Sequence, residues 1–287
     1  MQESPRLLGI EGPKMYPDLK EEIIPSKKRP TCRDHLTVIL AEFFGTSILV
    51  FLSCTGSCVG MQGDSMSSMH TSFTAGLAVA AVIQIFAHVS GAHVNPAVSI
   101  NALILNQITW YYFPSYFIAQ VLGSLAGAGL FYIVTKREYL GIQSNGHGMC
   151  VNSLSDYISP LQGFMVEICL SIILNLAICA SWDARNSNKL DSVSLKIGLL
   201  VVVLNLGGVA YTGASMNPSR SFGPAVLSGD YQHHWIYWFG PIIGAIIASI
   251  MYKLFFADKK REGLVGIHPY EKNITSQTRE DMKGQRT

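Results

Sequence analysis

Six long apolar segments dominate the chain and restrict it to folds that cross a membrane. A span needs about 20 mostly apolar residues to cross the hydrocarbon core of a bilayer. The segments that meet this requirement are residues 36–59, 71–88, 113–134, 161–181, 193–211 and 235–256. Only 14% of the residues are charged, whereas soluble domains usually have about a quarter. The expected fold class is therefore an all-α membrane protein with six transmembrane helices.

The charged residues flank the apolar region and indicate its orientation. Lys and Arg concentrate before residue 34, after residue 252 and in the 182–196 loop. Positive residues next to spans mark the cytoplasmic side, and six spans place both tails on the same side. We therefore expect a multi-pass protein of the cell membrane with both termini in the cytoplasm. Lys136 and Arg137 are exceptions, because this topology places them outside.

The remaining composition argues against several other classes. The Lys and Arg residues lie in tails rather than on a folded basic face, so we expect no nucleic-acid partner. The sequence has no nucleophile–base pair or metal-ligand spacing, so we expect no enzyme, no metal site and no cofactor. The cysteines mostly fall inside apolar runs, where Cys acts as a small hydrophobic residue. No disulfide framework is expected among Cys32, Cys54, Cys58, Cys150, Cys169 and Cys179.

The second half of the sequence repeats motifs of the first. Residues 90–97 (SGAHVNPA) match residues 212–219 (TGASMNPS), and Glu42 in the first span recurs as Glu167 in the fourth. Three spans per half is an odd number, so the halves must cross in opposite directions, as an inverted internal repeat. The predicted organisation is a cytoplasmic tail, a membrane domain of two halves and a second cytoplasmic tail, at 1–34, 35–258 (halves about 35–135 and 160–258) and 259–287.

Each Asn-Pro pair of the repeat predicts the start of a short re-entrant half helix. Asn is a favoured N-cap and Pro is favoured at the first helical position. The apolar residues that follow, at 96–105 and 218–228, are too few to cross a bilayer. In an inverted repeat the two starts meet near the midplane, where the positive ends of both helix dipoles converge. The side-chain amides of Asn95 and Asn217 could then donate hydrogen bonds to a passing oxygen.

Arg220 lies three residues after Asn217, in the first turn of the second half helix. A cation is unfavourable at that helix end and at membrane depth, so local helix energetics do not account for it. A guanidinium that lines a narrow lumen would donate hydrogen bonds to a neutral solute and repel protons and other cations. The alternative is an Arg whose side chain extends to the membrane surface.

Glu42 and Glu167 are carboxylates inside spans. Irregular backbone at membrane depth must be satisfied by protein groups, so we expect each Glu to accept hydrogen bonds from the loop before its half helix. The alternative is a proton relay in a coupled transporter.

Together these residues resemble the aquaporin, or major intrinsic protein, family. The resemblance covers about residues 35–258 and rests on AEFFGT, SGAHVNPAVS and TGASMNPSRSFGPAV. It implies a homotetramer in the lipid bilayer, with one pore in each subunit and passive transport down a gradient; 35–258 would then be a channel domain. The pore centre carries over as Asn95, Asn217, Pro96, Pro218, Ala97 and Ser219, with Ser219 replacing the second Ala of the family motif.

The family's outer selectivity filter carries over as Ala75, Asn205, Ala214 and Arg220. Water-selective members have an aromatic residue and a His at the first two positions. Ala75 and Asn205 should widen the lumen, so the resemblance implies a channel for water plus glycerol, urea or both. This combination resembles the insect glycerol-transporting branch thought to descend from water channels. Asn205 could instead serve as a polar contact between helices.

Three other functions remain open. A strictly water-selective aquaporin is favoured by residues that resemble the water-channel branch, namely Ser221, Ala225, Tyr237 and Trp238. A proton-coupled transporter would use Glu42 and Glu167. An adhesive or junctional membrane protein would show negligible flux.

Overall fold

A computed structural model of the chain describes residues 32–58, 67–136, 140 and 150–257. The predicted tail at 259–287, and the one at 1–34 except for residues 32–34, lie outside these residues. Within the described part, six helices are long and apolar enough to span a bilayer, as predicted. They are α1 (Cys32–Ser57), α2 (Ser68–Ser90), α4 (Phe113–Val134), α5 (Pro160–Trp182), α6 (Val193–Thr212) and α8 (Ile236–Met251), which continues into the π-helical turn η3 (Tyr252–Phe256).

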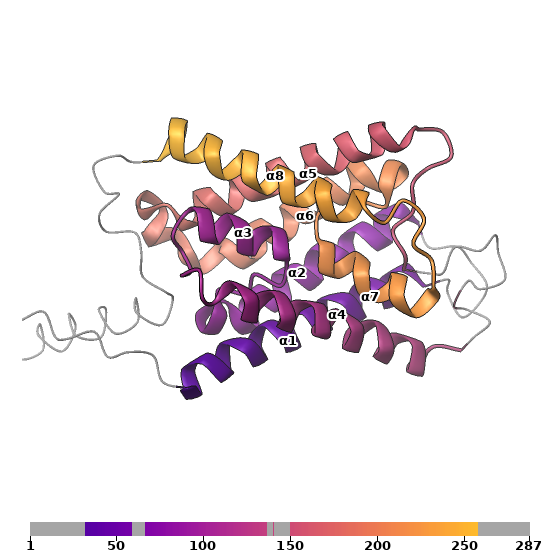
Figure 1. The fold of residues 1–287 in the computed structure, drawn as a ribbon, viewed down its shortest axis with the longest axis horizontal. Coiled ribbons are helices and arrows are strands. Elements are labelled where there is room, and N and C mark those ends of the chain that lie inside the picture. Colours follow the sequence, from indigo (N-terminus) through magenta and orange to yellow (C-terminus); the bar gives the residue numbers. More distant parts are fainter. Residues whose placement is uncertain (1–31, 59–66, 137–139, 141–149, 258–287) are drawn as a thin grey trace, which may run out of the picture.

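Two short helices begin at the Asn-Pro pairs. Helix α3 (Pro96–Ile104) and helix α7 (Pro218–Ser228) both start with Pro at the first helical position, as the sequence predicts. A 3₁₀ segment, η2 (Ala184–Ser192), connects α5 to α6. In Figure 1 the starts of α3 and α7 lie near the centre of the bundle, and the two helices run from there toward opposite ends.

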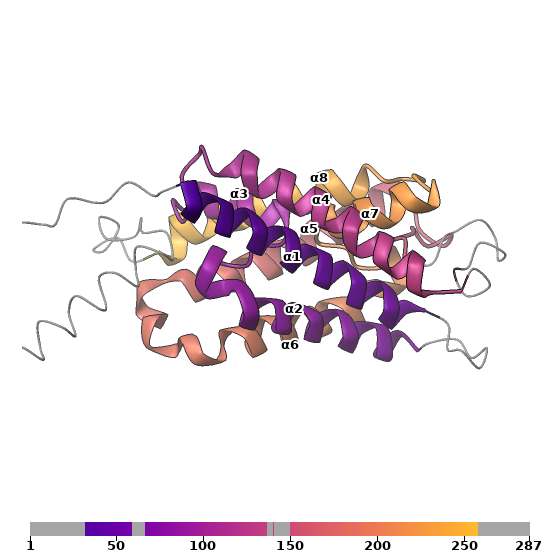
Figure 2. The ribbon, with the colours of Figure 1, turned by 90° about the horizontal axis from the view of Figure 1, so that it is seen from below.

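The two halves of the chain are packed as an inverted repeat. Helix α1 begins and η3 finishes at one end of the bundle, here called the tail end; α1 and α5 run in opposite directions between it and the far end (Figures 1 and 2). Helix α1 packs against α2 and α4, as α5 packs against α6 and α8. Helix α3 packs against α8, and α7 packs against α4, so each short helix completes the bundle of the other half.

Helices α1 and α4 approach closely along a face of α4 that carries small residues. A Cβ atom added at Gly123 would collide with the carbonyl oxygen of Phe43, and one at Gly127 with that of Ser47. Small residues permit this approach, on which dispersion contacts between helices in a bilayer depend. Large apolar side chains such as Ile133 and Leu161 point outward, as expected for a surface in contact with lipid.

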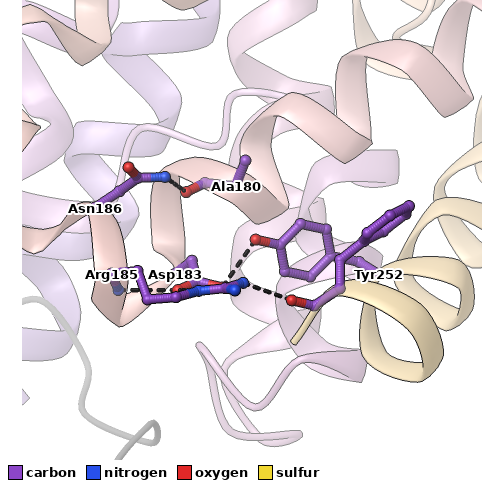
Figure 3. Close-up of polar contacts among 6 residues, drawn as sticks. Ala180, Asp183, Arg185, Asn186 and Tyr252 are labelled. Carbon is purple, nitrogen blue, oxygen red and sulfur yellow. Dashed lines mark hydrogen bonds and ion pairs between the residues drawn. The ribbon is translucent and has the colours of Figure 1, made fainter. Parts of the chain in front are cut away.

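A polar cluster at the tail end joins the start of η2 to η3 (Figure 3). Arg185 donates two hydrogen bonds to the Asp183 carboxylate, at 2.8 and 2.6 Å, and one to the Phe256 carbonyl. The Tyr252 hydroxyl donates to the same carboxylate at 2.9 Å. The Arg185 guanidinium holds the pKa of Asp183 well below its usual range. The cluster thereby fixes the connection that follows α5.

The packing of α1 against α4 predicts a position-specific loss of stability. Gly127→Ala should lower the free energy of unfolding by about 1–3 kcal/mol, since the new methyl group meets backbone rather than a movable side chain. The matched control is Gly129→Ala, where an added Cβ has no neighbouring atom within 4 Å. Thermal unfolding in detergent, followed by circular dichroism, should show a lower midpoint for the first variant alone. Equal shifts would contradict this account of the interface.

Candidate functional site

The loops that precede the two short helices adopt an unusual backbone conformation. Gly91 and Gly213 cap α2 and α6 with φ angles of 88° and 73°. Beyond them, four residues with side chains also have positive φ values, which cost on the order of 1–3 kcal/mol each. These residues are Ala92 (47°), Val94 (43°), Ala214 (49°) and Met216 (53°). Such a backbone persists only when its surroundings hold it in place.

The carboxylate of Glu42 holds the first loop. One of its oxygens accepts from the Ser90 hydroxyl at 2.6 Å and from the His93 backbone N–H at 2.9 Å. The other oxygen accepts from the Val94 backbone N–H and from the Gln120 side-chain amide, both at 2.8 Å. The carboxylate is fully buried, so these bonds replace the water that it would otherwise bind.

The carboxylate of Glu167 holds the second loop in the same way. It accepts from the Thr212 hydroxyl at 2.6 Å and from the backbone N–H groups of Ser215 and Met216 at 2.9 and 2.8 Å. Neither Glu167 nor Glu42 is among the described residues that line the central cavity. Their contacts therefore favour support of the loops over a proton relay.

The two Asn residues link the loops to each other across the centre of the bundle. The side-chain amide of Asn95 donates to the Met216 carbonyl at 2.9 Å, and that of Asn217 donates to the Val94 carbonyl, also at 2.9 Å. An Asn amide group carries two N–H bonds. Each residue therefore retains one further N–H after making its link.

The side-chain oxygens of the same residues cap the short helices. Asn95 Oδ1 accepts from the Ala97 backbone N–H at 2.9 Å, and Asn217 Oδ1 accepts from that of Arg220 at 3.2 Å. With the oxygen held at the helix and the nitrogen at the opposite loop, each amide has one orientation. Both helix N-termini, with their partial positive charge, point to the same place.

A cavity of about 550 Å³ runs past this meeting point. Asn95 and Asn217 line it, together with residues near the tail end such as Ser194 and Asp191. The other four residues predicted at the pore centre are buried and do not belong to the described lining: Pro96, Ala97, Pro218 and Ser219. Of the six residues predicted at the pore centre, Asn95 and Asn217 are thus the two that belong to the described lining of the cavity.

The four predicted filter residues also line this cavity. Ala75 lies on α2, Asn205 on α6, Ala214 in the second loop and Arg220 in the first turn of α7. The amide nitrogen of Asn205 donates to the Val201 carbonyl of its own helix at 3.0 Å. The side chain thus borders the cavity instead of linking two helices through this bond.

The guanidinium of Arg220 is held by a segment that sequence reasoning did not connect with it. Its Nη1 atom donates to the carbonyl of Cys150 at 2.6 Å, and Cys150 forms a disulfide with Cys54. The expectation of no disulfide framework was therefore wrong. Both cysteines are buried, and 96 positions separate them in the sequence, so their pairing depends on the tertiary fold.

Several residues that support the site were also missed. Ser90 and Thr212 occupy matching positions of the repeat, and each donates its hydroxyl to the Glu of its own half. That match was a usable signal. Gln120 and Asn152 carry no comparable pattern, and Asn152 bonds both the Gly213 carbonyl and the Ser221 hydroxyl, at 2.9 and 2.7 Å.

Comparisons with known proteins agree with this architecture. The family model described as Major intrinsic protein matches residues 31–252. Aquaporin-4 of Rattus norvegicus is 36% identical over 255 residues, which cover 88% of this chain and 76% of that protein. The lens fiber major intrinsic protein of Homo sapiens is 39% identical over 214 residues, covering 75% and 79%. The X-ray structure of the aquaglyceroporin from Plasmodium falciparum superposes with a TM-score of 0.65 at 26% identity, covering 80% of this chain and 99% of that one.

The contacts of Glu167 predict a test of its role. Glu167→Gln keeps one accepting oxygen and replaces the other with an NH2 group that donates instead of accepting, so a buried N–H or hydroxyl donor loses its partner. The free energy of unfolding should fall by about 1–3 kcal/mol. Asp156→Asn makes the same chemical change at an exposed position and should leave the thermal midpoint unchanged. A proton relay would instead predict solute accumulation driven by a pH gradient in the wild type, and loss of that accumulation in Glu167→Gln with stability intact.

Ser219 provides a second test, within the first turn of α7. Its hydroxyl is buried and has no hydrogen-bond partner among the described residues, so Ser219→Ala should leave the unfolding free energy unchanged or raise it by about 1 kcal/mol. The matched variant is Ser221→Ala, which removes a hydroxyl that bonds Ser215 and Asn152. This variant should be destabilised by about 1–3 kcal/mol. Chemical unfolding in detergent measures the free energy of unfolding of both variants. A larger loss in Ser219→Ala than in Ser221→Ala would contradict the conclusion that the Ser219 hydroxyl makes no hydrogen bond within the described part of the chain.

Proposed function

Because the chain belongs to the major intrinsic protein family, we propose that it conducts glycerol and urea as well as water through the cavity that Asn95, Asn217 and Arg220 line. The chain is a multi-pass membrane channel for water and small solutes, and it is not an enzyme. The observation that carries the finer proposal is the small size of the side chains around the outer constriction.

The outer constriction combines one long cationic side chain with three short ones. Ala75 and Ala214 contribute only methyl groups, and Asn205 is much smaller than a His or a Phe. An aperture bordered by such residues leaves room for a solute wider than water. The name of the solved neighbour, an aquaglyceroporin, supports the same solute class.

The polar groups of the constriction suit neutral solutes with several oxygens or nitrogens. Arg220 supplies donors and the amide of Asn205 supplies an acceptor, so a polyol or urea can exchange hydrogen bonds with water for bonds with the wall. Deeper in the cavity, the remaining amide hydrogens of Asn95 and Asn217 donate to the solute oxygen. The convergent helix N-termini and the guanidinium repel cations.

We further propose that the far end faces the cell exterior and that both termini are cytoplasmic. The Lys and Arg distribution supports this orientation, and so does the Cys54–Cys150 disulfide near the far end, because disulfides persist in oxidising surroundings. The family resemblance supports a homotetramer in the lipid bilayer, with one pore in each subunit, and the filter supports a place near the insect glycerol-transporting branch.

A strictly water-selective channel is the second candidate. It is favoured by Ser221, Ala225, Tyr237 and Trp238, which resemble the water-channel branch, and by the likeness to Aquaporin-4. The two candidates differ in a single measurement, the uptake of glycerol or urea by vesicles that contain the purified protein.

Narrowing the filter should separate the permeabilities of glycerol and water. In proteoliposomes, Ala75→Phe combined with Asn205→His should reduce glycerol and urea uptake by about tenfold or more, because both substitutions fill the aperture. Water permeability, measured by light scattering after an osmotic step, should change much less. Leu77→Phe is the control, since it adds the same ring on α2 at an exposed position outside the described cavity lining. Wild-type glycerol uptake no faster than that of empty vesicles would reject the proposal in favour of the water-selective channel.

A further inference from the structure

A short segment between α4 and α5, residues 150–152, lies beside the outer constriction. The carbonyl of Cys150 accepts from the Arg220 guanidinium at 2.6 Å. Two residues later, Asn152 accepts from the Ser221 hydroxyl at 2.7 Å and donates to the Gly213 carbonyl at 2.9 Å. The segment thus contacts the first turn of α7, which carries Arg220, and the cap residue of α6, Gly213, which directly precedes Ala214.

A covalent bond anchors this segment to the helix bundle. Cys150 is joined to Cys54 on α1, and both pack in a buried apolar cluster with Val50, Ala128 and Phe131. Helices α1 and α4, which provide this cluster, are in close contact. Cys150 also has a φ of 71°, a left-handed conformation that residues with side chains adopt rarely and that must be held by their surroundings.

The position of the guanidinium depends on what it can bond. An Arg side chain has many rotamers, and fixing it in one of them costs conformational entropy. The filter residues Ala75 and Ala214 offer no polar side-chain group to hold it. The Cys150 carbonyl does, and the direction of that carbonyl follows from the backbone conformation at the anchored residue.

We propose that the Cys54–Cys150 disulfide is a positioning element of the outer constriction: it holds the Cys150 carbonyl, which holds the Arg220 guanidinium, and it thereby determines which solutes pass. The proposal rests on the proposed function, since it takes the cavity past Arg220 as the solute path. It assigns the disulfide a role in selectivity beyond the stability that any cross-link contributes.

The test compares solute selectivity rather than total activity. Cys54→Ser, Cys150→Ser and the double variant are reconstituted into proteoliposomes, and the permeabilities to water, glycerol and a longer linear polyol are measured for equal amounts of folded protein. Without the anchor the guanidinium leaves its position, so the ratio of polyol to water permeability should rise about threefold or more. Both single variants and the double variant should change this ratio equally, because each breaks the same bond. Cys169→Ser, at an exposed cysteine that forms no disulfide, should leave it unchanged.

If the variants fail to fold, the reconstituted wild type is treated with a water-soluble phosphine. The phosphine is oxidised to its oxide with the oxygen of one water molecule, and the two sulfurs leave as thiols, which are counted by labelling. An unchanged permeability ratio, in folded variants or in the reduced wild type, overturns the proposal. Failure of this proposal can be told apart from failure of the proposed function. A wild type that excludes glycerol rejects the proposed function. A ratio of polyol to water permeability that rises when the disulfide is broken still supports the role of the disulfide.

Discussion

The structure depends on satisfying two stretches of irregular backbone in the middle of a bilayer. Lipid offers no hydrogen bonds, so the loop N–H and carbonyl groups that do not face the cavity need partners within the protein. Glu42 and Glu167 accept the N–H groups of the two loops, and Asn95 and Asn217 donate to carbonyls of the opposite loop. These groups make the re-entrant helices possible. They also tie the halves together at the point where the cavity passes, so that the contacts that stabilise the fold also shape the lumen.

The repeat gives the channel a symmetric frame, and departures from the repeat make its two sides different. Three residues after each Asn, a side chain lines the cavity: Val98 in the first half and Arg220 in the second. The first is apolar and the second is cationic. The inverted packing places these positions on opposite sides of the centre. The cation therefore borders one side of the path, where it faces short side chains and the anchored Cys150 carbonyl.

Most of the fold was predictable because its signals are local. A long apolar run predicts a span from about 20 consecutive residues, and Asn-Pro predicts a helix start from two, which is why the observed helices begin at Pro96 and Pro218. The repeat then supplied the relation between distant segments. Contacts without such a relation were not predictable. The Cys54–Cys150 pairing joins residues 96 positions apart. Which residues of each Asn-Pro motif line the cavity depends on the geometry of the helix cap, and Pro96 and Ser219 do not belong to the described lining.

The structure also bears on the conflict between the filter and the residues that resemble water-selective relatives. Ser221 bonds Asn152, Tyr237 is fully buried and Trp238 donates its indole N–H to His234 at 3.0 Å. None of the three belongs to the described lining of the cavity, whereas Ala75, Asn205 and Ala214 do. Side chains away from the lumen act on a solute only through the packing that they support. A lineage can therefore keep the interior of one branch while a few substitutions at the aperture admit the solutes of another.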